Sequence, residues 1–81
     1  MMTVQDEIYD FLRDNQNNWF NLREISAEME RNYYLIVKQV NRMMKFPDLF
    51  DGMELRYVKE FRKRGYWKVK YYRYNGKNHL Q

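Results

Sequence analysis

Cysteine is missing from this sequence, while histidine and proline occur once each and glycine three times. Without cysteine there is no disulfide and no thiolate site, and the single His79 does not build a metal centre alone. The glycines at positions 52, 65 and 76 are isolated, so they do not form a phosphate-binding loop. Catalysis needs acids, bases or nucleophiles that converge on a pocket, and the pattern indicates none. We therefore expect no enzyme, no cofactor, no metal and no small-molecule substrate.

Long apolar runs are missing as well. No stretch approaches the roughly 20 apolar residues that a membrane-spanning helix requires. The N-terminal residues also lack the basic-then-apolar layout of a signal peptide. We expect an intracellular protein, cytoplasmic if its source is prokaryotic or viral, that does not bind membranes.

Aromatic residues, in contrast, are abundant at 19% of the chain, and eight of them are tyrosines. A chain of 81 residues is near the lower limit for folding without a disulfide or metal, so large rings must supply much of the core. The length predicts a single domain over residues 1–81. Within it we expect a folded core over residues 3–74 and a flexible C-terminal tail over residues 75–81.

The net charge of +4 conceals a difference between the two parts of the chain. Residues 1–30 contain seven acids and two bases, whereas residues 31–81 contain thirteen bases and four acids. This asymmetry favours one face that binds a polyanion, because Lys and Arg near phosphates release condensed counterions. The alternative is a basic surface that is simply solvated.

Two short helices are predicted first. Apolar residues at helical spacing indicate a helix over residues 4–15, with Thr3 as its N-cap. An extended piece at residues 19–20 follows. A capping box of Asn21 and Glu24 then indicates a second helix of about two turns.

A third helix is predicted over residues 33–46, where Pro47 ends it. One face of this helix is apolar and consists of Tyr33, Ile36, Val37, Val40, Met43 and Met44. The opposite face carries no acid and consists of Arg31, Tyr34, Lys38, Arg42 and Lys45, flanked by Gln39 and Asn41. Leu35 also falls toward this basic face, and the pattern does not explain it.

The apolar period becomes alternating after a loop whose Leu49 and Phe50 we expect to enter the core. The alternation predicts two strands within residues 55–74, joined by a tight turn in which Gly65 supplies a positive φ. Residues 56–73 contain eight bases and one acid, and the bases are densest at residues 62–64.

This order of elements resembles the winged helix-turn-helix superfamily over residues 3–74. The resemblance implies an α+β fold in which three helices are followed by a two-stranded β-hairpin wing. It also implies a recognition helix at residues 33–46 in the major groove of double-stranded DNA, and a wing at residues 55–74 on the backbone or minor groove. The function implied is sequence-specific or general DNA binding by a small transcriptional regulator, with a homodimer as a possible assembly.

Side-chain chemistry then suggests individual roles. Arg42 suits a bidentate contact to guanine, and Asn41 or Gln39 suits adenine, whereas lysines suit phosphates. Arginine at the wing tip suits backbone phosphates or a narrow minor groove. The expected DNA-binding residues are Arg31, Tyr34, Lys38, Gln39, Asn41, Arg42, Lys45, Arg62, Lys63, Arg64, Lys68 and Lys70.

Two other functions remain open at this point. A protein-interaction module of the same fold would expose an apolar or aromatic patch and bind DNA weakly. RNA binding would use Tyr66, Tyr72 and Tyr74 as platforms for stacked bases. Arg31 and Arg56 also have a simpler reading as ion-pair partners, with three acids as candidates: Glu28, Glu30 and Glu54.

Overall fold

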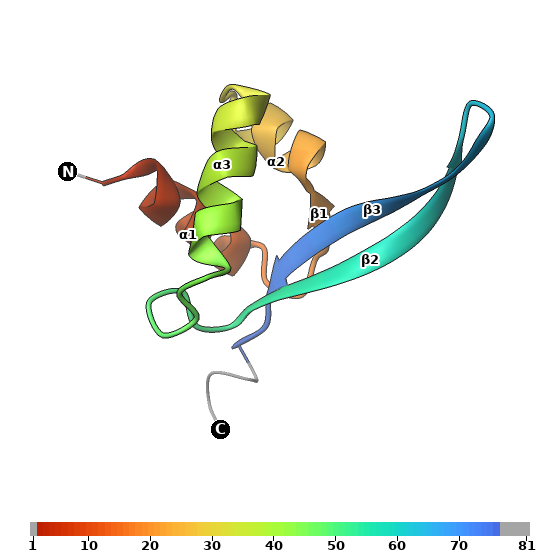
Figure 1. The fold of residues 1–81 in the computed structure, drawn as a ribbon. Coiled ribbons are helices and arrows are strands. Elements are labelled where there is room, and N and C mark those ends of the chain that lie inside the picture. The colour runs from red at the N-terminus through yellow and green to blue at the C-terminus, as the bar shows by residue number, and fades with distance from the viewer. Residues whose placement is uncertain (1, 77–81) are drawn as a thin grey trace.

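Helices precede the main strands in the computed structural model, which describes residues 2–76 (Figure 1). The elements are α1 (Val4–Asp14), β1 (Phe20–Asn21), α2 (Leu22–Met29), α3 (Tyr33–Met43), β2 (Met53–Arg62) and β3 (Gly65–Tyr74). The predicted α+β class is confirmed. Residues 77–81, which include His79 and most of the expected tail, lie outside the described residues. In the part of the chain that is described, no helix is long and apolar enough to cross a membrane.

The sheet differs from the two-stranded hairpin that the sequence predicted. Within residues 2–76 it has three antiparallel strands in the order β1-β3-β2. The additional strand forms because Phe20 pairs with Tyr72 and Asn21 pairs with Tyr71. A strand of two residues has no alternation that a sequence pattern can reveal, so only the short extended piece was predicted there.

The predicted helix starts are confirmed by their capping bonds. The Thr3 hydroxyl accepts from the Asp6 amide at 3.1 Å, and the Asp6 carboxylate accepts from the Thr3 amide at 3.2 Å. Asn21 and Glu24 form the same reciprocal pair, with both bonds at 2.8 Å. Asn32 caps α3 because its side-chain oxygen accepts from the amides of the helix's first turn.

The end of α3 was predicted three residues too late, since the helix ends at Met43 instead of residue 46. The following amides bond to carbonyls three residues back, Lys45 to Arg42 at 3.1 Å and Phe46 to Met43 at 3.0 Å. This tighter turn replaces the α-helix before Pro47, which disfavours helical geometry in the residue that precedes it.

The core lies between the three helices and the base of the sheet. Its buried residues are Ile8, Leu12, Ile25, Ile36, Val40, Met43, Tyr72 and Tyr74. Phe50 packs against this cluster as expected, but Leu49 is 71% exposed, so the prediction that it enters the core was wrong. The turn at residues 47–50 directs only one of the two neighbouring side chains inward.

The turn between β2 and β3 also differs from the prediction. The strands pair without interruption from Met53 opposite Tyr74 to Arg62 opposite Gly65, which leaves a two-residue turn. The positive φ falls on Lys63, at 53°, and Gly65 is an ordinary member of β3. The expectation that Gly65 supplies the left-handed conformation was therefore wrong. The turn consists of Lys63 and Arg64, so Gly65 already belongs to the strand.

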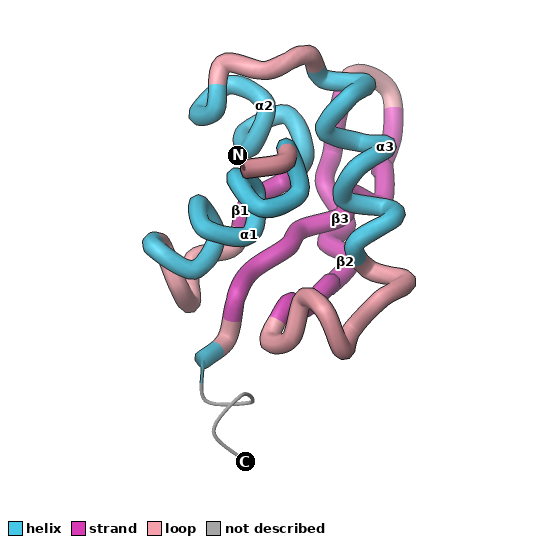
Figure 2. The backbone as a smooth tube through the Cα atoms, turned by 90° about the vertical axis from the view of Figure 1, so that its left-hand side faces the viewer, coloured by secondary structure: helices cyan, strands magenta, loops and turns pink. Residues whose placement is uncertain are grey.

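The β2–β3 ribbon is longer than the core that supports its base, and it projects away from the helices (Figure 1). Figure 2 shows α3 and the far end of this ribbon on the same side of the molecule, with α1 and α2 on the other side. The fold therefore places the basic α3 and the basic far end of the ribbon on one side of the molecule.

Candidate nucleic-acid interface

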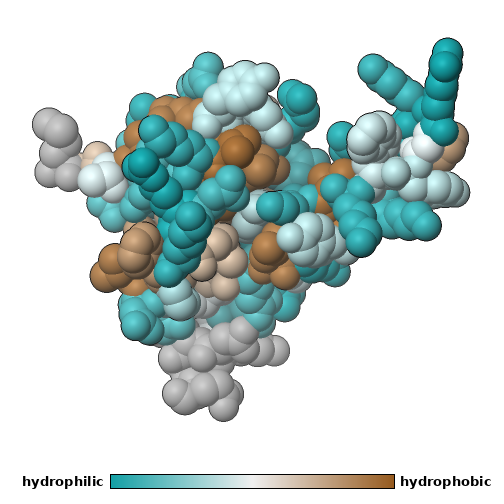
Figure 3. Space-filling model, viewed as in Figure 1, coloured by the Kyte–Doolittle hydropathy of each residue, from teal (hydrophilic) through white to brown (hydrophobic). Residues whose placement is uncertain are grey.

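The outer face of α3 is exposed as predicted. Its exposed residues are Tyr34, Lys38, Asn41 and Arg42. Lys45 is also exposed, but it lies in the turn after the helix and not on the helix as predicted, because α3 ends at Met43. The helix contains no acid, and among the described residues Lys38, Arg42 and Lys45 have no ion-pair partner. Figure 3 shows strongly hydrophilic residues over this surface and at the far end of the ribbon. Three cations are thus available to an anion on this face.

Two residues that the sequence assigned to this face are engaged elsewhere. The Gln39 Oε1 atom accepts from the side-chain Nε2 of Gln5 at 2.8 Å in a partly buried contact, so Gln39 faces α1. Arg31 precedes the helix, and its guanidinium donates to both carboxylate oxygens of Glu7 at 2.7 and 2.8 Å. The ion-pair partner of Arg31 is therefore Glu7, and not one of the three acids that the sequence suggested. A residue of α1 neutralises it instead, which no local pattern could show.

The β2–β3 ribbon has two chemically different faces. Residues that lie opposite each other in the register belong to the same face. The face that continues from the buried Tyr72 and Tyr74 carries lysines and aromatic rings. Its successive cross-strand pairs are Tyr57 with Lys70, Lys59 with Lys68, and Phe61 with Tyr66. Lys59 and Lys68 place two like charges opposite each other, an arrangement that destabilises a sheet unless an anion compensates it.

The other face of the ribbon is held together by ion pairs and stacked cations. Arg73 donates to Glu54 at 2.6 Å. The guanidinium carbons of Arg56 and Arg73 lie 4.4 and 4.5 Å from the Trp19 ring centroid. Arg56 is therefore a stacking partner of Trp19 at the base of the ribbon, where it joins the ribbon to the segment before β1.

Glu60 is the one acid within residues 56–73, and its charge is compensated locally. It accepts hydrogen bonds from the Tyr71 hydroxyl and from Arg62, the latter at 2.8 Å. These bonds lower the pKa of Glu60, and the same contact raises the pKa of Tyr71. Arg62 is thereby partly neutralised. Lys63 and Arg64 at the tip have no ion-pair partner among the described residues.

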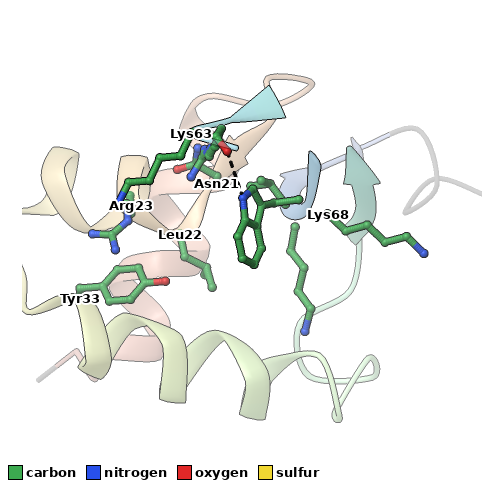
Figure 4. A pocket seen from close by; sticks show the side chains of 10 residues that line it. Asn21, Leu22, Arg23, Tyr33, Lys63 and Lys68 are labelled. Atoms are coloured by element: carbon green, nitrogen blue, oxygen red, sulfur yellow. Dashed lines mark hydrogen bonds between the residues drawn. The ribbon is translucent and has the colours of Figure 1, made fainter. Parts of the chain in front are cut away.

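A groove of about 510 Å³ separates the first turn of α2 from β3 (Figure 4). Its apolar lining comes from Leu22, Trp67 and Val69. The charged residues around it are all cations, namely Arg23, Arg62, Lys63, Lys68 and Lys70. The Trp67 ring nitrogen donates to the Arg62 carbonyl at 3.3 Å, and the Arg23 guanidinium lies 4.6 Å from the Tyr33 ring centroid.

Several residues of this surface were not predicted as functional. Large rings of the ribbon are more than half exposed at Tyr57, Phe61 and Trp67, and so is Tyr66, which the sequence had suggested only for RNA stacking. The alternating pattern assigned these residues to one or the other face of the hairpin. It did not show that the ribbon extends beyond the core and leaves them exposed. Arg23 was missed because its position near the ribbon depends on how α2 packs. Tyr72 and Tyr74 are buried, so the expectation that they stack on RNA bases was wrong.

Comparisons with known proteins return no match, whether to a family model, to a curated protein or to a solved structure.

Proposed function

We propose that this chain is a winged helix-turn-helix protein that binds double-stranded DNA, with α3 in the major groove and the β2–β3 ribbon as the wing. The observation that carries the proposal is the outer face of α3 together with the turn that follows it, where Lys38, Arg42 and Lys45 are exposed and have no ion-pair partner among the described residues. An α-helix about 10–12 Å across fits a major groove about 12 Å wide.

The exposed polar residues of α3 and of the turn after it have roles that follow from their chemistry. Arg42 is suited to donate two hydrogen bonds to guanine, and Asn41 to exchange two with adenine. Lys38 and Lys45 suit phosphates on either side of the groove. Gln39 takes no part in this proposal because its side chain is bonded to Gln5.

The wing contributes contacts to the DNA backbone. Lys63 and Arg64 lie exposed at its tip, where they suit phosphates or the minor groove. The opposed Lys59 and Lys68 support an anion bound over the ribbon, because a phosphate there would relieve their repulsion. A DNA-binding domain of this kind fits a small transcriptional regulator, which commonly reads two half-sites as a homodimer.

The first test compares Arg42→Ala with Arg13→Ala, which removes an equal charge from α1. We expect Arg42→Ala to weaken binding to a selected duplex about tenfold, the loss of a bidentate base contact. Arg13 pairs with Asp10 within α1, so its substitution should leave the affinity unchanged. Fluorescence anisotropy with a labelled duplex measures both. Equal effects of the two substitutions would contradict the assignment of α3.

A salt titration on random duplex tests the phosphate contacts. We expect the logarithm of the association constant to fall linearly with the logarithm of salt concentration, and Lys38→Ala to reduce that slope by about 1. Affinity that does not depend on salt for any duplex would overturn the proposal.

A protein-interaction module is the second candidate, and the exposed rings of the ribbon favour it. Tyr57, Phe61 and Tyr66 are 58%, 65% and 65% exposed on one face, an arrangement typical of a contact surface. If this candidate is correct, Phe61→Ala abolishes capture of the partner, while Arg42→Ala leaves it intact.

A further inference from the structure

The edge of β3 is only partly covered by its neighbour β1. β1 pairs with Tyr71 and Tyr72, and the chain then turns into α2 at Leu22. From residue 70 toward the tip, no strand among the described residues lies beside this edge. Unpaired strand edges offer a row of backbone donors and acceptors to another extended chain.

The backbone groups that face this edge can be assigned from two hydrogen bonds. The Tyr74 carbonyl accepts from the Asn17 amide at 2.9 Å on the β1 side, and the Asn75 amide donates to Gly52 at 2.8 Å on the β2 side. Successive residues of a strand direct their backbone groups to opposite sides, and the β2–β3 register is unbroken. Tyr66, Lys68 and Lys70 therefore direct their amides and carbonyls outward, in line with β1.

The groove described above runs along this same edge (Figure 4). It separates the edge from α2 and has a volume of about 510 Å³. An added strand would lie about 4.8 Å from β3, between its edge and α2. The edge therefore has both unpaired backbone groups and adjacent space.

The side chains beside the edge define the sequence that an added strand requires. Lys68 and Lys70 lie on one face of β3, whereas Trp67 and Val69 lie on the other. Side chains of the added strand alternate between the same two faces. Acidic residues would then lie beside the lysines, and apolar residues would lie against Trp67 and Val69.

We propose that the β3 edge binds an extended acidic segment of another protein, with alternating acidic and apolar residues, as an added strand. A second copy of this chain is a poor partner, because its own Lys68 and Lys70 would lie against these lysines and repel them. Nucleic acid supplies charge but no peptide backbone to pair with Lys68 and Lys70. The proposal does not depend on DNA binding. Because both lysines also belong to the proposed DNA interface, we expect the acidic segment to compete with DNA.

The test uses the full chain and a capped nine-residue peptide of alternating glutamate and valine. The matched control has the same composition with all glutamates in one block and all valines in another. We expect the alternating peptide to bind at least about tenfold more tightly by isothermal titration calorimetry. Hydrogen exchange followed by NMR should show new protection of the Lys68 and Lys70 amides.

Two variants separate the backbone contribution from the charge. Lys68→Ala removes the charge and keeps the amide, whereas Lys68→Pro removes both. The amide of residue 68 faces away from β2, so proline there leaves the β2–β3 ladder intact. We expect Lys68→Pro to bind the alternating peptide about three- to tenfold more weakly than Lys68→Ala, the effect of one lost hydrogen bond.

Three results would overturn this proposal. The first is equal binding of the alternating and block peptides, or no binding of either. The second is protection of the same amides by single-stranded oligothymidine at lower concentration than by the alternating peptide. The third is self-association of the chain that protects these amides without any peptide. A failure of duplex DNA binding, by contrast, leaves the peptide titration unaffected.

Discussion

The turn into β2 depends on Gly52, whose φ is +90°. A Cβ atom at this position would lie 2.7 Å from the Tyr74 ring, which is itself packed edge-on against Tyr9 with a centroid distance of 5.7 Å. A side chain at this position would be strained by the positive φ and would clash with the Tyr74 ring. A single residue thus determines how the base of the sheet closes against α1.

Replacement of two glycines by alanine tests this requirement. We expect Gly52→Ala to lower the free energy of unfolding by more than about 1 kcal/mol, because it adds strain at positive φ and a clash. Gly65→Ala is the matched control, since no atom lies within 4 Å of its added Cβ. Urea denaturation measures both. A Gly52→Ala variant as stable as Gly65→Ala would show that Tyr74 moves freely.

At the scale of the element, α3 combines two faces with different functions. Ile36, Val40 and Met43 are buried against the other helices and the sheet, whereas the opposite face is exposed. Stability and proposed DNA binding therefore depend on different residues of the same helix. Substitutions on one face should leave the property of the other face unchanged.

Ile36→Ala and Tyr34→Ala separate these two faces. We expect Ile36→Ala to reduce the free energy of unfolding by about 2–5 kcal/mol, because it removes buried methyl groups and leaves a cavity. Tyr34 is 78% exposed, so Tyr34→Ala should change stability by less than about 0.5 kcal/mol. Urea denaturation measures the free energy of unfolding of both variants. Similar losses for both variants would be inconsistent with the two-faced arrangement.

At the scale of the whole molecule, tyrosines take the place of aliphatic residues in a small core. Tyr72 is 1% exposed, and its burial raises the pKa of its hydroxyl. Burial likewise raises the pKa of Tyr9, with the neighbouring Tyr74 as a further cause. The folded chain thus holds both hydroxyls in their neutral form at a pH where the unfolded chain loses the proton.

Folding stability should therefore fall at high pH. A raised pKa in the folded state leaves stability intact below the ordinary tyrosine pKa of about 10 and reduces it as the pH rises beyond that value. Each such tyrosine contributes a slope of up to about 1.4 kcal/mol per pH unit. Urea denaturation between pH 8 and 11 measures this slope. Tyr72→Phe keeps the ring and removes the titrating group, so its slope should be shallower; an unchanged slope would exclude Tyr72 as a cause.

Local chemistry was sufficient to predict much of the structure. The caps at Thr3 and Asn21 depend on residues three apart, and the exposed face of α3 follows from helical spacing alone. The change from helical to alternating period also located the two long strands. These features were predictable because each depends on residue types and spacing within a short stretch of the chain.

Contacts between distant residues could not be predicted in this way. Glu7 holds Arg31, Gln5 holds Gln39, and Trp19 lies against Arg56, in each case across more than 20 residues of chain. These contacts removed two residues from the predicted DNA-binding face. They depend on how the elements pack, which side-chain spacing does not encode.

The sequence by itself determined the α+β class, the order of the elements and the basic outer face of α3, because these follow from local periodicity and charge. Only the tertiary structure decided that β1 joins the sheet, that Tyr72 and Tyr74 are buried, and that β3 keeps an open edge beside α2. Strand pairing and burial bring together residues about 50 positions apart, and the free energy that selects those partners exists only in the packed chain.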